Sequence, residues 1–402
     1  MAAAPGTLTV QETLVRWGPA YLERFGTTMP PRQRTVLEKL LQCRTPALGG
    51  ALYACPDCGH SHYCYHSCND RHCPQCGGQD ADQWLQAQQA LLLPVPYFLV
   101  TFTVPEGLRR WLRSHPQEGY GWLWTASSQA LQELAQNPQR LGATLGMLGV
   151  LHTWSRTLEH HPHVHYLVPG GGLSLDQRQW VPSSPKFLVR VEPLSDRFRN
   201  LFRQTLEKAD PEALAQIPAA VWKQRWVVHS LPVGDGQQAL GYLSRYVFKT
   251  ATGNRRLTLL ADGRLRWPYR DSESGQWRHL DLEPCEFVRR FLQHVLPQGF
   301  HRVRWFGWLH PGGRKRGNRV RALLHQAPRL TAAERQAWLP AAPEDQLEPT
   351  DSTETRPAAI AWPRCPRCQA VLVLVRRARP LPARLRRQAS GQGPAAREQP
   401  PP

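Results

Sequence analysis

Residues 161–172 read His-Pro-His-Val-His-Tyr-Leu-Val-Pro-Gly-Gly-Gly. This apolar run, closed by glycines, predicts a β-strand that ends in a turn. Side chains along a strand alternate between its two faces, so His163 and His165 point one way and Val164 points into the packed side. Two imidazoles on one face can hold one divalent metal ion. A His-x-His pair alone is a weak signal, because 16 histidines make such pairs common by chance.

A second stretch, residues 242–249, reads Tyr-Leu-Ser-Arg-Tyr-Val-Phe-Lys within a predicted helix. Tyr242 and Tyr246 are one helical turn apart and share a face, and Arg245 and Lys249 follow them at the same offset. A tyrosine hydroxyl, with an ordinary pKa of about 10, is a weak nucleophile. When the tyrosine hydroxyl attacks a phosphodiester, a metal ion and a cation such as Lys249 would stabilise the charge that develops. Taken alone, both tyrosines are more simply explained as core aromatics, but beside the histidine strand they indicate nucleophiles.

The composition indicates a polyanionic partner. The chain has 402 residues, a formal net charge of +19 and a pI of about 10.0. This length exceeds what one core usually holds, so we expect two or more units. A basic excess of this size is typical of proteins that bind nucleic acid. The candidate DNA-binding side chains are Arg71, Arg245, Arg302, Arg304, Arg314, Lys315 and Arg316.

Two of the 15 tryptophans, Trp305 and Trp308, lie among these cations. Aromatic rings between cations suit single-stranded nucleic acid, where bases stack and phosphates pair. Packing of a strand explains the two tryptophans equally well.

The chain shows no sign of a membrane protein. Its N-terminus lacks a basic start followed by an apolar run, and no apolar stretch approaches the roughly 18 residues of a membrane span. We therefore expect a cytoplasmic protein. In that compartment clustered cysteines are more often metal ligands than disulfides.

The cysteines predict zinc. Cys55-Pro-Asp-Cys58 and Cys73-Pro-Gln-Cys76 have the spacing of a four-thiolate Zn²⁺ site, which is structural because it leaves no open coordination position. Arg71 is close enough in sequence to serve a DNA-contacting surface there.

Other potential zinc ligands have no settled role. Cys68 and His72 either complete a second zinc site with neighbouring histidines or Cys64, or are loop residues. Cys365-Pro-Arg-Cys368 is half a site, which borrows ligands, pairs with another chain or binds nothing.

Hydrophobic periodicity predicts an α+β fold in which a central antiparallel sheet, flanked by helices, carries the histidine strand. Expected strands cover residues 97–104, 146–154, 163–168, 225–231 and 301–308; expected helices cover residues 11–43 (two helices), 80–93, 122–134, 196–208, 237–250 and 283–296. We expect a helical, zinc-binding domain over residues 1–95, a catalytic domain over 96–310, and a basic, proline-rich, largely disordered tail over 311–402.

The spacing Tyr-x-x-Arg-Tyr-x-x-Lys resembles the two-tyrosine motif of the rolling-circle replication initiators of small single-stranded-DNA phages. The whole layout resembles the two-tyrosine HUH transposases of the insertion-sequence-91 type. The likeness rests on the cysteine-rich N-terminal region, the stretch 150–154 before the histidines, the tyrosine helix and the stretch 286–297. It spans roughly residues 10–310.

This resemblance implies an HUH endonuclease-like core and rolling-circle-like DNA transposition. Single strands would be nicked and rejoined through 5′-phosphotyrosine intermediates, with Mg²⁺ or Mn²⁺ at the catalytic site. His163 and His165 carry over as metal ligands, and Tyr242 and Tyr246 as nucleophiles. The implied partners are single-stranded and double-stranded DNA, especially transposon ends.

Several alternatives stay open. The third metal ligand could be His161, His152 or Gln238. A replication initiator or relaxase would use the same tyrosine chemistry. A non-catalytic zinc-dependent DNA-binding protein would use the tyrosines only for packing, and a metal-dependent hydrolase would form no covalent intermediate.

Overall fold

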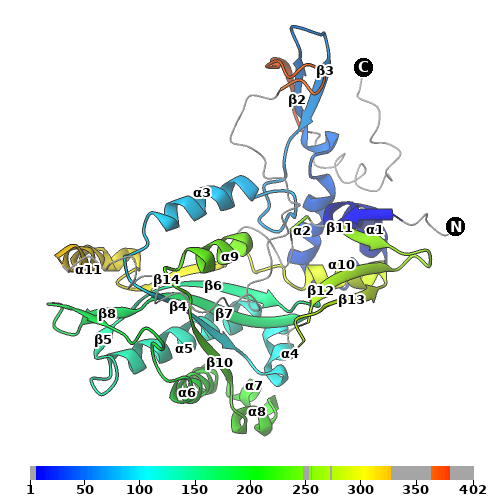
Figure 1. Ribbon diagram of the computed structural model, residues 1–402. Coiled ribbons are helices and arrows are strands. Elements are labelled where there is room, and N and C mark those ends of the chain that lie inside the picture. Colours follow the sequence, from blue (N-terminus) through cyan, green and yellow to red (C-terminus); the bar gives the residue numbers. More distant parts are fainter. Residues whose placement is uncertain (1–5, 248–252, 255, 272–273, 327–363, 381–402) are drawn as a thin grey trace. The chain divides into compact units, whose positions relative to one another are not determined.

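The computed structural model describes residues 6–247, 253–254, 256–271, 274–326 and 364–380 (Figure 1). The side chains of Gln79, Tyr246 and Arg256 fall outside this description. The chain forms two compact units. One combines residues 83–247 with 296–349, and the other combines residues 1–82 with 248–295 and 350–402.

The first unit is built on a five-stranded sheet in which all neighbouring strands are antiparallel. Its order is β10 (Val227–Pro232), β4 (Tyr97–Thr103), β7 (His160–Pro169), β6 (Gly146–Trp154) and β14 (Val303–Gly307). The sequence-based expectation of a central antiparallel sheet in an α+β fold is therefore confirmed. A separate small sheet runs in the order β5 (Ala143–Thr144), β8 (Gly171–Ser174) and β9 (Trp180–Pro182); β5 precedes β6 in the chain, and β8 and β9 follow β7.

Helices cover both faces of the five-stranded sheet (Figure 1). On one face lie α4 (Glu106–Ser114), α5 (Pro116–Gln136), α6 (Val191–Ala209), α7 (Pro211–Gln216) and α8 (Ala219–Lys223). Their core includes Phe102, Trp124 and Phe198. Gly149 on β6 permits this packing, because a Cβ there would lie 2.4 Å from the Trp124 ring. Each fully buried aromatic contributes about 1.5–3 kcal/mol of transfer free energy.

The other face is covered by α9 (Gln237–Val247) and α11 (Arg314–Gln326), and the C-terminal half of α3 (Gly78–Gln89) packs into the same core. In α9 the apolar side chains of Ala239, Leu240 and Leu243 recur at helical spacing and are all buried. Gly236, with φ of +81°, sits just before the helix, where a Cβ would lie 2.8 Å from the Tyr97 ring. This close approach fixes the start of α9 against β4.

The second unit contains α1 (Val10–Phe25), α2 (Pro31–Gln42) and α10 (Pro284–Leu292). A four-stranded antiparallel sheet runs in the order β1 (Gly6–Thr9), β11 (Arg256–Leu259), β12 (Leu265–Arg270), β13 (Trp277–Leu282). Thr9 and Glu12 form a reciprocal capping box at the start of α1. A three-stranded sheet joins β2 (Gly50–Ala54) and β3 (Ser61–Tyr65) to β15 (Val373–Ala378).

These units divide the chain differently from the three consecutive segments that the sequence predicts. Residues 248–295, expected in the catalytic segment, belong to the unit that begins at the N-terminus. The reason is the long-range pairing of β1 with β11, which no local pattern reveals. The functional domain boundaries stay a prediction.

The tail expected to be largely disordered has ordered parts. Residues 314–326 form α11, and residues 364–380 include β15. The remainder of the tail, 327–363 and 381–402, lies outside the described residues. No helix in the described part of the chain has the length and hydropathy needed to cross a bilayer.

Candidate active site

Three histidines converge on the α9 face of the five-stranded sheet. His163 and His165 point the same way from β7, as strand alternation predicts. The register between β6 and β7 sets His152 directly opposite His163. The ring centroid of His152 is 5.2 Å from that of His163 and 4.6 Å from that of His165. One nitrogen from each ring lies within 4.8 Å of the others, so the three can hold a single metal ion.

The protonation of these rings suits metal binding. Nδ1 of His163 lies 2.7 Å from the carbonyl oxygen of His161 and must donate its proton to it, which leaves the Nε2 lone pair for an ion. Nδ1 of His165 lies 2.8 Å from the Thr101 hydroxyl. Its Nε2 is buried and has no hydrogen-bond partner among the described residues. A buried nitrogen in that condition fits a coordinating role.

Electrostatics keep the three rings neutral near pH 7. Burial lowers the pKa of His163 to about 4. Burial, followed by the charges of His165 and His163, holds the pKa of His152 well below its ordinary value. Burial, followed by the charge of His163, likewise holds the pKa of His165 well below its ordinary value. A neutral imidazole is the form that binds a metal ion.

Tyr242 lies over the histidine cluster. Its ring centroid is 6.0 Å from that of His165 and 6.1 Å from that of His152. The buried neighbours on α9, Leu240 and Leu243, hold this helix face on the sheet. Tyr246 follows one turn later on α9, but its side chain is outside the described residues, and so is the whole of Lys249. The structure therefore places one of the two predicted nucleophiles beside the predicted metal ligands.

A pocket of about 500 Å³ opens beside the same histidines. His161, His163 and His165 form one wall, and Arg109 on α4 contributes a guanidinium. Nε of Arg109 is buried without a hydrogen-bond partner among the described residues. A cationic group beside a metal site can receive a phosphate oxygen. No sequence pattern indicates Arg109, because its role depends on the packing of α4 against β7.

Two groups of four cysteines form in the second unit. Cys43, Cys68, Cys73 and Cys76 make the first, and Cys55, Cys58, Cys365 and Cys368 make the other. In the first group, Sγ of Cys43 is 3.6 Å from Sγ of both Cys73 and Cys76, and Sγ of Cys68 is 3.8 Å from Sγ of Cys76. Sulfurs bound to one tetrahedral zinc ion stand about 3.8 Å apart.

This grouping corrects the predicted single site of Cys55, Cys58, Cys73 and Cys76. Cys55 and Cys58 lie in the turn between β2 and β3, whereas Cys73 and Cys76 follow the base of that hairpin. A strand of five residues spans about 17 Å, so the two pairs cannot share an ion. Cys43, at the end of α2, completes the first group instead.

The two further zinc ligands predicted for this region have different fates. Cys68 joins the first group. His72 does not, because its buried Nδ1 lies 2.7 Å from a carboxylate oxygen of Asp70. Although burial opposes the effect, hydrogen bonding to His72 lowers the pKa of Asp70 to about 2.

Comparisons with known proteins agree with this layout. A family model described as "Transposase zinc-binding domain" matches residues 13–104, and one described as "Putative transposase" matches residues 146–317. The protein named "Putative transposase y4qJ" from Sinorhizobium fredii (strain NBRC 101917 / NGR234) is 39% identical over 330 residues, which cover 78% of this chain and 81% of the relative. The chain belongs to the two-tyrosine transposases of the insertion-sequence-91 family.

A second relative of this insertion-sequence-91 transposase is named "Transposase for insertion sequence element IS801", from Pseudomonas savastanoi pv. phaseolicola. It is 32% identical over 292 residues, covering 67% of this chain and 68% of the relative. No solved structure matches the chain significantly. The resemblance read from the sequence is thus confirmed, including its N-terminal zinc-binding domain.

The basic residues predicted to contact DNA are placed unevenly in this transposase. Arg314, Lys315 and Arg316 begin α11 and are exposed. Arg302 is only 4% exposed. Arg304 packs over the rings of Trp124 and Phe300, on the face of the sheet opposite α9.

The remaining candidates are partly buried. Arg71 and Arg245 are intermediate in exposure, and burial lowers the pKa of Arg71. Trp305 is partly buried in the core beneath α9 and α11. Trp308 is 3% exposed and donates its ring N–H to the carbonyl oxygen of Thr144. Packing thus accounts for Trp308, whereas α11 carries the exposed basic surface.

Proposed function

We propose that this transposase cuts and rejoins single DNA strands through a covalent link to tyrosine. In the cleavage step, the Tyr242 hydroxyl oxygen forms a bond to phosphorus while the bond from phosphorus to the 3′ oxygen breaks. The tyrosine loses its proton and the 3′ oxygen leaves as a hydroxyl. The energy of the broken bond is kept in the 5′-phosphotyrosine link, so attack by a 3′ hydroxyl reverses the step without ATP.

The position of Tyr242 is the observation that carries this proposal. A tyrosine that served only for packing would need no neighbouring metal ligands. The Tyr242 ring centroid nevertheless lies 6.1 Å from that of His152 and 6.0 Å from that of His165. We assign it the role of initiating nucleophile, and we assign the second strand-transfer step to Tyr246. The helix that carries both would lie on an HUH endonuclease-like sheet.

His152, His163 and His165 would hold the catalytic divalent ion. When bound, Mg²⁺ or Mn²⁺ supplies polarisation of the scissile phosphate and neutralises the charge that develops on its oxygens. Three imidazole nitrogens favour Mn²⁺ over Mg²⁺, which prefers oxygen ligands. Arg109 would bind a phosphate oxygen of the strand in the adjoining pocket. The thiolates of Cys43, Cys68, Cys73 and Cys76 would hold a structural Zn²⁺.

A direct test uses single-stranded oligonucleotides that carry the ends of the DNA element, labelled at either the 5′ or the 3′ terminus. With Mn²⁺ present, the protein should acquire covalently only the fragment on the 3′ side of the cut, and the other fragment should end in a free 3′ hydroxyl. Cleavage that leaves a free 5′ phosphate and no adduct would support a hydrolase. Tight binding without cleavage would support a DNA-binding protein that is not an enzyme.

The contact between Thr101 and His165 gives a prediction about metal affinity. Thr101→Val removes the hydroxyl that lies 2.8 Å from Nδ1 of His165 while keeping the shape of the side chain. Loss of such an orienting group lowers metal affinity about 10- to 100-fold. Calorimetric titration with Mn²⁺ should show this loss for Thr101→Val.

The matched control is Thr103→Val, on the same strand and opposite His163. No hydrogen bond from Thr103 to a histidine occurs in the described structure, so its Mn²⁺ affinity should stay close to that of the unaltered protein. Equal losses of Mn²⁺ affinity in Thr101→Val and Thr103→Val would show that Thr101 does not orient His165 for metal binding.

The exposed start of α11 gives a prediction about DNA affinity. Replacing Arg314, Lys315 and Arg316 with alanine should weaken single-strand binding and lower the slope of log affinity against log salt by about 2, at about 0.7 per phosphate contact. A triple alanine variant of Arg203, Lys208 and Lys223 loses the same charge on the α6 and α8 side of the sheet. Its slope should stay unchanged; an equal change in both would show only a net-charge effect.

A further inference from the structure

We propose that Cys365 and Cys368 complete a second structural zinc site with Cys55 and Cys58. The shared ion would link the C-terminal segment 364–380 to the β2–β3 hairpin. Cys58 and Cys365 are 307 positions apart in the chain. The C-terminal pair lies outside both stretches that match family models, 13–104 and 146–317. The proposal does not depend on the tyrosine chemistry.

The four sulfurs have the geometry of one ion's ligands. Sγ of Cys55 is 3.4 Å from Sγ of Cys368, and Sγ of Cys58 is 3.5 Å from that of Cys365 and 3.6 Å from that of Cys368. All four lie within 4.8 Å of one another. These spacings are close to the edge of a zinc–thiolate tetrahedron, about 3.8 Å. They are far longer than a disulfide bond, about 2.05 Å, and all four cysteines are free.

The backbone around the two pairs is built in the same way. Each pair is a Cys-Pro-x-Cys turn followed by a residue with positive φ, Gly59 at 70° and Gln369 at 64°. In each, the residue after the turn donates its N–H to the carbonyl oxygen of the first cysteine, at 3.0 Å for Gly59 and 2.9 Å for Gln369.

A second backbone hydrogen bond is repeated as well. The N–H of Cys55 is 2.9 Å from the carbonyl oxygen of His60, and that of Cys365 is 2.8 Å from the carbonyl oxygen of Ala370. Gln369 accepts a left-handed conformation that costs a non-glycine residue free energy. The two distant segments thus adopt the same turn conformation, and each directs its pair of cysteine sulfurs toward the pair of the other.

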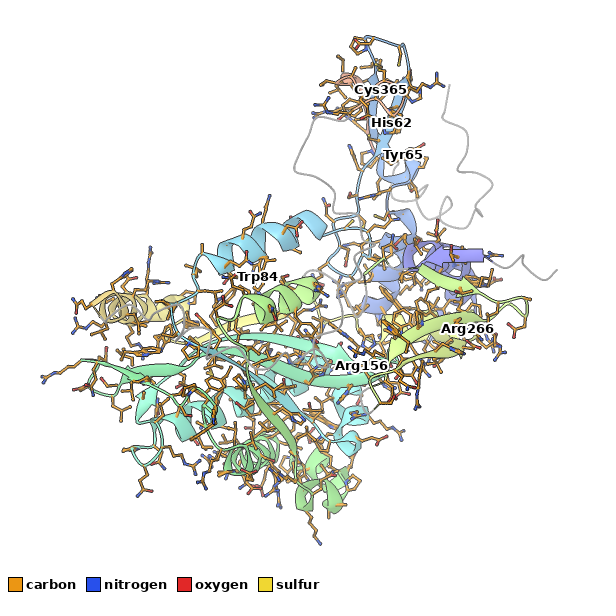
Figure 2. The ribbon with its side chains drawn as sticks, viewed as in Figure 1. His62, Tyr65, Trp84, Arg156, Arg266 and Cys365 are labelled. Atoms are coloured by element: carbon orange, nitrogen blue, oxygen red, sulfur yellow. The ribbon has the colours of Figure 1, made fainter. Side chains whose placement is uncertain are left out.

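Among the described residues, segment 364–380 is held mainly by strand pairing with β2 and by one small core. β15 pairs with β2 and extends the β2–β3 hairpin to three strands, as Figure 1 shows, and Figure 2 places Cys365 beside this hairpin, which also carries His62 and Tyr65. The core beneath it consists of Cys55, Cys365 and Leu372, with Tyr53 and Ala370 at its edge. Val373 and Val375 are 57% and 58% exposed.

So small a core cannot compensate the conformational entropy lost on ordering 17 residues. A metal ion supplies the missing stabilisation, because the binding free energy of a structural ion is folding free energy. Four thiolates select Zn²⁺ rather than the harder Mg²⁺ or Mn²⁺, and leave no open position for catalysis.

The zinc content of the purified full-length protein tests the site. Elemental analysis should give two zinc ions per chain, one for each cysteine group. Cys365→Ser/Cys368→Ser should lower the content to one. The matched control, Cys64→Ser/Cys285→Ser, alters two cysteines outside both groups and should keep two. One zinc in the unaltered protein, or two in Cys365→Ser/Cys368→Ser, would overturn the proposal.

A second experiment leaves every cysteine in place, so it does not depend on how a variant folds. A specific protease site is inserted between residues 326 and 364, and the cleaved protein is passed over a size-exclusion column. The C-terminal fragment should co-elute with the rest of the chain and separate after zinc is removed with a chelator. The proposed zinc link would be contradicted by a fragment that separates while zinc is still bound, or by one that stays attached after zinc is removed.

Discussion

Tyr242→Phe should reduce formation of the covalent DNA adduct by at least about 1000-fold, because no other atom of that side chain can form the bond to phosphorus. The phenylalanine ring keeps the packing that Tyr242 makes 6.0 Å from His165 and beside Leu243. Single-strand affinity should therefore stay within about threefold. Adduct yield with labelled oligonucleotide, measured on a denaturing gel, separates the two effects.

The matched control for this substitution is Tyr269→Phe, which removes a hydroxyl from β12 in the other unit. Its adduct yield should equal that of the unaltered protein. If Tyr242→Phe still forms adduct at the normal rate, then Tyr242 is not the initiating nucleophile. Adduct that also survives in Tyr242→Phe/Tyr246→Phe would exclude tyrosine chemistry altogether.

His152→Ala should reduce Mn²⁺ affinity by at least about 100-fold, equivalent to about 2.7 kcal/mol of binding free energy. His152 supplies one of the three nitrogens that converge beside Tyr242, and two remaining ligands hold a divalent ion poorly. At a fixed low Mn²⁺ concentration, cleavage should fall by a similar factor. Raising the Mn²⁺ concentration should recover part of it by mass action.

His161→Ala is the control that decides which histidine completes the proposed metal site. His161 is on the same strand face as His163 but outside the convergent group, so Mn²⁺ affinity should change by less than about threefold. His152 is 1% exposed, and its truncation leaves a cavity that can destabilise the fold. The free energies of unfolding of both variants, measured without metal, would give that loss of stability separately. A larger loss of Mn²⁺ affinity in His161→Ala than in His152→Ala would identify His161, not His152, as the third ligand.

Local periodicity was enough to predict the elements that carry this site. Alternation along residues 161–172 predicted that His163 and His165 share a face, and helical spacing predicted α9. The sequence alone does not identify the third histidine, because His152 becomes a neighbour of His163 only through the register of β6 on β7. Register depends on the whole sheet, not on the residues of one strand.

The two cysteine groups show a second limit of sequence patterns. Two Cys-x2-Cys pairs predicted one site, but the β2–β3 hairpin separates them and recruits partners from elsewhere. Cys43 carries no motif, and Cys365 lies far along the chain. The sequence does not reveal burial either: Arg302 looks like a DNA-binding side chain, yet it is buried in the folded chain. Contacts between distant segments decide these roles.

The chain itself offers a direct test of the tyrosine chemistry. Trypsin cuts after Arg245, so Tyr242 falls in the peptide Trp226–Arg245 and Tyr246 in the peptide Tyr246–Lys249. After reaction with a single-stranded oligonucleotide bearing an element end, digestion with nuclease and trypsin followed by mass spectrometry should find Trp226–Arg245 carrying a nucleotide through its 5′ phosphate. Cleaved DNA with both tyrosine peptides unmodified, and a free 5′ phosphate on the product, would contradict strand transfer through tyrosine.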